Sequence, residues 1–237
     1  MILAVYGFIF GCLIPYFARK IGKLCSFTMG YVLLKLFIPT HYMPWKKLKN
    51  NPKYTELLIR YIMRSIGWGI FSAAASYIFC TCFNPSHQYF YIAFLWMLLL
   101  LIEIDKRFML LPDVLTVPLL VIGFLYAANG GVWLASENLP MLSLAQNSAL
   151  GAICGYLMPV IASMAIVWKY PDAFGGGDIK LLCVIGAWVG AENIPYILLG
   201  SCIFFVFSCL INRSKIGPFG PSIIYATLLF CVLMLGN

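Results

Sequence analysis

The sequence predicts an all-α fold: a polytopic integral membrane helical bundle with about eight transmembrane helices. Of its 237 residues, 62% are hydrophobic and only 10% are charged, and the mean hydropathy is +0.93. Charged residues make up about a quarter of a typical soluble domain, so this chain could not bury its apolar surface in water. The apolar residues form long runs without polar alternation, which favours membrane helices over membrane strands.

The apolar runs predict eight spans, since a helix needs about 20 residues to cross a bilayer. Basic residues follow the first run rather than precede it, so we expect a membrane anchor and not a cleaved signal peptide. The sixth run is short, and only "GAENIP" separates it from the seventh. The predicted spans are residues 2–18, 66–83, 88–104, 114–130, 146–168, 179–191, 195–212 and 220–236.

The basic residues predict the orientation of the chain in the membrane. With eight spans, all 16 Lys and Arg residues fall on one side, and the loops "NPSHQ", "ANGGVWLASENLPMLS" and "GAENIP" on the other side carry none. Basic loops stay in the cytoplasm, so we expect both termini to be periplasmic. The net charge of +8 therefore reports orientation, and we expect no nucleic-acid partner.

One cytoplasmic segment stands out within a single membrane domain that we expect to cover residues 1–237. Residues 19–65 form a basic insert with ten of the basic residues and one acid, Glu56. The run "MGYVLLKLFIP" in this insert is too short to span comfortably and predicts an interfacial or partly buried helix. We expect the insert to bind anionic membrane lipid, with a protein docking surface as the alternative.

Two acids are expected to share one depth in the membrane. Asp105 ends the third predicted span and Asp178 begins the sixth, and the topology places both at the cytoplasmic edge. Ionisable groups at such positions are rare and usually functional. Two facing carboxylates cannot both ionise easily, so they share a proton and can activate a water that attacks a peptide carbonyl. Glycines 175–177 lack Cβ atoms, so they let a substrate backbone or the partner helix approach closely. We also expect all three to loosen the chain before the helix of Asp178 starts.

Other roles for the acids stay open at this point. Asp178 fits a helix N-cap, and Asp113, which follows "LLP", fits the N-cap of the fourth span. Glu103 lies two residues before Asp105, on another helix face, where it would snorkel or pair with a base. The spacing alone does not choose between Asp105 and Asp113 as the partner of Asp178.

Three motifs, in order over roughly residues 90–225, resemble those of bacterial type IV prepilin peptidases. "IDKRFMLLPDVLTVPLL" resembles their first-aspartate region, "GGGDIKLLCVIGAWVG" their G-x-G-D region, and "GPFGPSI" their late P-F-G-P motif. The resemblance implies that Asp105 and Asp178 are the catalytic acids. The neighbouring motif residues, Gly175, Gly176, Gly177, Lys180, Pro112 and Asp113, would bind substrate or give loop flexibility.

The resemblance also implies a function and a location. The family consists of inner-membrane aspartic endopeptidases of the GxGD class. They remove the basic leader of prepilins or type II secretion pseudopilins at the cytoplasmic face, cutting after a glycine. The family also N-methylates the new amino terminus with S-adenosylmethionine. The alternatives are a proton- or cation-coupled transporter that uses the paired acids, and an inactive assembly protein that keeps the fold.

The cysteines do not predict a metal site. Most of the nine lie inside apolar runs, where they act as small hydrophobes, and the pair Cys80 and Cys82 lacks further ligands nearby. Many family members carry two C-x-x-C pairs, thought to hold zinc, in a region where this chain has only Cys25. We therefore expect no zinc and no cofactor for proteolysis, and S-adenosylmethionine only if methyl transfer is retained.

Overall fold

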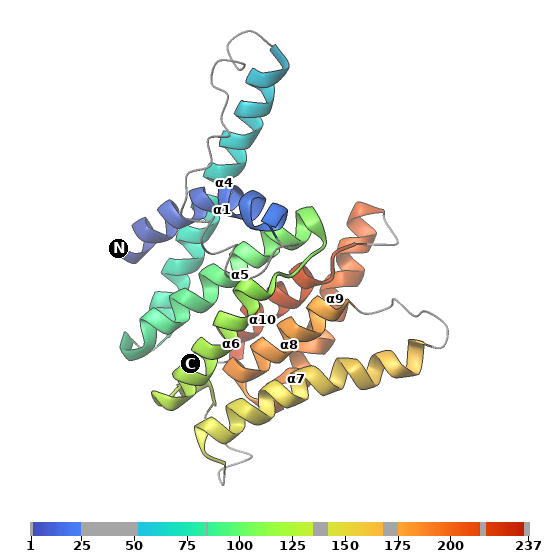
Figure 1. Cartoon of the computed structure of the whole chain (residues 1–237). Coiled ribbons are helices and arrows are strands. Elements are labelled where there is room, and N and C mark those ends of the chain that lie inside the picture. Colours follow the sequence, from blue (N-terminus) through green and yellow to red (C-terminus); the bar gives the residue numbers. More distant parts are fainter. Residues whose placement is uncertain are drawn as a thin grey trace.

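The computed structural model describes residues 2–24, 52–83, 85–134, 142–167, 175–213 and 217–234 (Figure 1). Within these ranges the chain forms eight α-helices, three single 3-10 turns and no strand, which confirms the predicted all-α class. The helices are α1 (Ile2–Leu24), α4 (Pro52–Cys82), α5 (Gln88–Phe108), α6 (Asp113–Ala128), α7 (Leu144–Val167), α8 (Gly176–Val189), α9 (Ile194–Asn212) and α10 (Gly220–Met234). The 3-10 turns are Pro85–His87, Val132–Leu134 and Ala191–Asn193.

Each of the eight predicted spans coincides with one of these helices. Five helices, α1, α4, α5, α7 and α9, are long and apolar enough to cross a membrane, which supports an integral membrane protein. Apolar helices α6 and α10 are shorter, and α8 has only 14 residues. Side chains on α9 such as Leu199, Phe207 and Leu210 are more than 60% exposed, as expected for a helix that faces lipid.

Helix α4 begins at Pro52, well before the predicted start of its span at residue 66. Its first turns are polar enough to leave the membrane, and Arg60 pairs with Glu56 one turn earlier at 2.5 Å. The basic end of the insert therefore continues the helix of the span, and these turns project beyond the rest of the bundle (Figure 1). The predicted interfacial helix at residues 29–39 lies outside the described residues.

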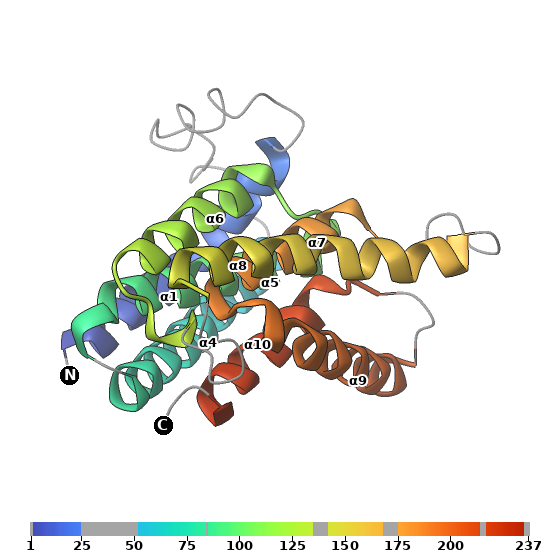
Figure 2. The same ribbon diagram turned by 90° about the horizontal axis from the view of Figure 1, so that it is seen from below.

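Helix α5 is the centre of the bundle. Its sequence from Tyr91 to Ile104 is apolar on almost every face, and 12 of its residues are buried, as expected for a helix surrounded by others. Helices α1 and α4 pack together and against one side of α5, while α10 packs against another. Seen from below, α7 lies in front of α8 and in contact with it, and α9 lies next to α10 (Figure 2).

The α7–α8 pair depends on glycines that allow two backbones to touch. A Cβ atom on Gly151 of α7 would overlap the carbonyl of Gly186 on α8, and the reverse is also true. Small residues give membrane helices this close packing. Because α8 lies between α7 and α6, this contact sets the position of the helix that carries Asp178.

Candidate active site

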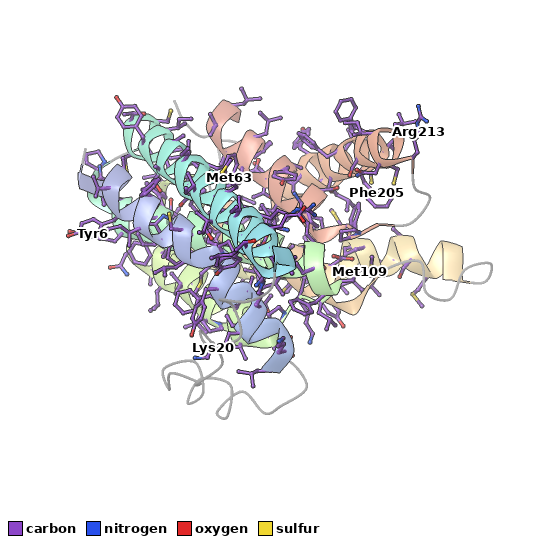
Figure 3. The ribbon with its side chains drawn as sticks, turned by 90° about the horizontal axis from the view of Figure 1, so that it is seen from above. Tyr6, Lys20, Met63, Met109, Phe205 and Arg213 are labelled. Atoms are coloured by element: carbon purple, nitrogen blue, oxygen red, sulfur yellow. The ribbon has the colours of Figure 1, made fainter. Side chains whose placement is uncertain are left out.

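Asp105 lies near the end of α5 and is only 4% exposed. The helix stops at Phe108, where Met109 adopts a left-handed backbone (φ 50°) and donates its N–H to the carbonyl of Asp105 at 2.9 Å. Seen from above, Met109 marks this end of α5, with α1 and α4 on one side and α7 and α9 on the other (Figure 3). The chain then turns through residues 110–112 into α6.

Asp178 is the third residue of α8 rather than its N-cap. The extended residue before the helix is Gly175 (φ −68°, ψ 132°), and the N–H of Asp178 donates to the Gly175 carbonyl at 3.0 Å. The N-cap alternative for Asp178 is therefore wrong. The expectation that all three glycines precede the helix is also wrong, because Gly176 and Gly177 lie in its first turn.

Asp113 is likewise the first residue of α6 and not its N-cap. Pro112 holds the N-cap position because its ring favours the extended conformation seen there (φ −74°, ψ 134°). The Asp113 side chain instead forms an ion pair with Lys180 of α8, with both oxygens within 2.9 Å of Lys180 Nζ.

One pocket brings together the eight residues that the resemblance assigns to the site. It has a volume of about 350 Å³ and opens at the end of the bundle where α5 ends and α6 and α8 begin. Two of its walls are the loop after α5 and the first turn of α8. Its lining consists of Asp105, Met109, Leu110, Leu111, Pro112, Asp113, Gly175, Gly176, Gly177, Asp178 and Lys180.

Two of the three carboxylates in this pocket, Asp105 and Asp178, lack basic partners. Neither Asp105 nor Asp178 takes part in any ion pair found among the described residues. Oδ2 of Asp105 is buried, and no described side chain donates a hydrogen bond to it. Asp178 lies outside the five candidate spans, and burial, followed by the negative charge of Asp105, raises its pKa to about 7. The pocket can therefore hold a proton on a carboxyl group near neutral pH.

Glu103 has no place in this pocket. It is fully buried on another face of α5, where it accepts hydrogen bonds from Arg64, Trp68 and Arg107. The expectation that it pairs with a base is thus confirmed. The alternative, that it snorkels toward water, is wrong.

Sequence reasoning missed Gly220, which lies directly behind Asp105. A Cβ atom on Gly220 would lie 2.6 Å from Oδ2 of Asp105 and 3.3 Å from Leu111. Gly220 is the first residue of α10, so its lack of a side chain lets α10 approach the buried carboxylate. The motif "GPFGPSI" contains this glycine and could have pointed to it, but the motif alone does not indicate that the glycine lies beside an acid.

The described cysteines are free thiols, and Cys25 lies outside the described residues. Across the part of the chain that the structure describes, no group of three or more His, Cys, Asp or Glu side chains is arranged to hold a metal ion.

Fold and pocket together define an integral membrane protein with a buried acid, Asp105, and a partly buried acid, Asp178, in one pocket at the end of its bundle. Comparison with known families gives a narrower result, because residues 92–211 match the model of the type IV leader peptidase family. The chain belongs to this family. The match covers both acids and favours the peptidase hypothesis over the transporter hypothesis.

The chain is also similar to several proteins named prepilin leader peptidase/N-methyltransferase. It is 34% identical over 130 residues to that of Vibrio cholerae, covering 52% of this chain and 47% of the relative. It is 34% identical over 146 residues to that of Dichelobacter nodosus (58% and 46%), and 35% identical over 138 residues to that of Aeromonas hydrophila (53% and 43%). The aligned part spans about half the length of these relatives, and no solved structure matches the chain.

Proposed function

We propose that the chain is a membrane aspartic endopeptidase in which Asp105 and Asp178 form the catalytic pair. The observation that carries this proposal is that two carboxylates without basic partners, from α5 and α8, line one pocket. The raised pKa of Asp178 supports a pair that holds one proton between two acids near neutral pH.

The reaction follows from that shared proton. The ionised acid takes a proton from a water molecule, whose oxygen attacks the carbon of a peptide carbonyl. The protonated acid gives its proton to the carbonyl oxygen, which forms a tetrahedral intermediate with two hydroxyl groups. The acid that took the water proton then passes it to the nitrogen as the C–N bond breaks, and the other acid takes a proton back from one of the hydroxyl groups. The remaining lining residues have supporting roles. Gly175 and Gly177 leave room for the substrate backbone and for the loop after α5, and Pro112, Asp113 and Lys180 shape the entrance.

The substrate class that fits best is a prepilin or type II secretion pseudopilin. This inference draws on the names of the relatives, which describe prepilin leader peptidases. Such a substrate has an apolar helix in the membrane and a basic leader in water. A pocket at one end of a membrane bundle, beside the loop after α5, would meet the junction between the two.

We further infer that the pocket faces the cytoplasm of a bacterial inner membrane and that both termini are periplasmic. The described basic residues at helix ends, such as Lys20, Lys106 and Arg213, lie at the end of the bundle that holds the pocket, which supports this orientation. Residues 1–237 would act as one peptidase domain, with residues 19–65 as a cytoplasmic part of it.

The test is a cleavage assay with the full chain. The chain is co-expressed with a prepilin, and leader removal is followed by gel shift and mass spectrometry. Asp105→Asn and Asp178→Asn are expected to abolish cleavage, while Glu56→Gln, an exposed acid remote from the pocket, is expected to cleave normally. Cleavage by Asp178→Asn at the wild-type rate would overturn the catalytic assignment, and a wild type that cuts no prepilin would overturn the proposed substrate. A methyl-sized mass increase on the product would reveal N-methylation by S-adenosylmethionine.

A further inference from the structure

Three arginines from three helices surround one carboxylate on the side of α5 away from Asp105. Glu103 and Arg107 are four residues apart and share a face of α5, whereas Asp105, midway between them, lies on the opposite face. Arg19 comes from α1 and Arg64 from α4, the two helices that pack together beside α5 (Figure 3). We call Arg19, Arg64 and Arg107 the arginine cluster.

The single acid of this group is already fully used. Oε2 of Glu103 accepts hydrogen bonds from Arg64 Nη2 at 2.9 Å and from Trp68 Nε1 at 3.0 Å. Its Oε1 accepts one from Arg107 Nε at 2.5 Å. The guanidinium carbon of Arg19 lies 4.5 Å from the centre of the Tyr61 ring, and Arg19 is close enough to the other two arginines to interact with them electrostatically.

The cluster therefore carries an excess of about two positive charges. Glu103 is the only acid that pairs with any of the three arginines within the described ranges, since Glu56 is bound to Arg60. Segment 25–51, which joins α1 to α4, contains no acid at all. Nη2 of Arg107 is buried and has no hydrogen-bond partner among the described residues, which is unfavourable unless an acceptor binds there.

We propose that the arginine cluster binds a phosphate group. Guanidinium groups donate pairs of parallel hydrogen bonds to phosphate oxygens, and two or more of them together select an anion of multiple oxygens. The side chain of Arg64 is 46% exposed and that of Arg107 is 16% exposed, while Glu103 is not exposed, so an incoming ligand meets cations and not the carboxylate. The cluster lies near the end of the bundle at which α1 and α5 end.

The same phosphate chemistry has two sources, an anionic lipid headgroup and a free phosphate ion. The full chain is purified in a neutral detergent, and thermal unfolding is followed while phosphatidylglycerol, phosphatidylcholine or inorganic phosphate is added. Stabilisation by phosphatidylglycerol alone identifies a lipid site, and stabilisation by inorganic phosphate as well identifies a site for the free ion. If phosphatidylglycerol and inorganic phosphate stabilise no more than phosphatidylcholine, the proposal is wrong.

Variants separate a binding site from a charge group that only holds helices together. Arg64→Gln is expected to weaken binding of the stabilising phosphate ligand about fivefold, the usual effect of one basic residue near an anionic surface. Arg60→Gln, one turn away on α4 and paired with Glu56, is the matched control and should bind as wild type does.

Glu103→Gln should change the affinity for phosphate in the opposite direction from Arg64→Gln. Removing the carboxylate of the cluster should strengthen phosphate binding, even if it lowers the melting temperature without ligand. A purely structural group predicts that none of the three variants changes the phosphate concentration needed for half of the stabilisation. Equal weakening by Arg60→Gln and Arg64→Gln would likewise overturn the site in favour of general surface charge.

Discussion

Lys180 Nζ lies 2.8 Å from Oδ1 and 2.9 Å from Oδ2 of Asp113, and this pair joins the N-terminal part of α8 to the first turn of α6. Both side chains are about half exposed, at 51% and 55%, and ion pairs this exposed stabilise a fold by at most about 1 kcal/mol. The position of the pair is more informative, because Lys180 is only two residues from Asp178 at the mouth of the pocket. The pair holds the start of α8 against α6.

Lys180→Met is therefore expected to affect cleavage much more than stability. The unfolding free energy should fall by less than about 1 kcal/mol, while misplacement of Asp178 should slow cleavage by about tenfold to a hundredfold. The measurements are prepilin cleavage rates and thermal unfolding, with the exposed residue Lys23 mutated to Met as the control. If the two residues act as a unit, the double variant Asp113→Asn/Lys180→Met should cleave no more slowly than Lys180→Met alone. A double variant whose loss of cleavage rate equals the product of the two single losses would count against the pair.

Gly220→Ala should inactivate the enzyme without removing any polar group. The added Cβ would lie 2.6 Å from Oδ2 and 3.1 Å from Cγ of the buried Asp105, so the carboxylate would have to move. We expect cleavage to fall by about a hundredfold, as for other small displacements of a reacting group. Gly217→Ala is the matched control, since a Cβ there meets no atom within 4 Å. Wild-type cleavage by Gly220→Ala would show that Asp105 does not need its present position.

Much of this arrangement could be predicted from the sequence because the bilayer constrains it. Long apolar runs must be helices in a membrane, so each predicted span matches a helix, and the basic residues place Asp105 and Asp178 at the same end. The helix starts were predicted less well. An acid that follows proline or glycine looks like a cap, but Pro112 and Gly175 adopt the extended conformation themselves and leave Asp113 and Asp178 inside the first turn.

Other parts of the site depend on contacts between distant segments that no local pattern encodes. The pairing of Lys180 with Asp113 requires α6 and α8 to lie side by side, which follows from how both pack in the bundle. The approach of Gly220 to Asp105 requires α10 to lie against α5. The sequence motifs indicate which regions form the site, whereas the contacts between individual side chains are visible only in the structure.

The three consecutive glycines should differ in their tolerance of substitution. A Cβ on Gly176 meets no atom within 4 Å, and this residue lies inside α8, where alanine favours the helix by about 0.5–1 kcal/mol over glycine. Gly176→Ala should therefore keep or raise the melting temperature, and cleavage should continue. A Cβ on Gly177 would lie 3.0 Å from Leu111 Cβ, so Gly177→Ala should displace the loop after α5 and slow cleavage. Equal loss of cleavage in both variants would mean that the glycines serve chain flexibility or substrate access rather than packing.

The Asp178 carboxyl should make stability depend on pH. Its pKa is raised from 3.8 to about 7, first by burial and then by the charge of Asp105, so the folded chain holds this proton more tightly than the unfolded chain does. The stabilisation by that proton is complete below the unfolded pKa and is lost as the pH rises toward about 7, because ionisation then favours unfolding. Asp178→Asn cannot ionise and avoids this loss.

The melting temperature of Asp178→Asn, measured in detergent, should therefore exceed that of wild type by little at about pH 4 and by most at about pH 8. Glu56→Gln is the control, since its exposed carboxylate pairs only with Arg60 and lies outside the pocket. If the difference in melting temperature between Asp178→Asn and wild type stays constant from acid to alkaline pH, the pKa of Asp178 is not raised by folding. The shared proton on which the proposed cleavage chemistry depends would then have to reside elsewhere in the pocket.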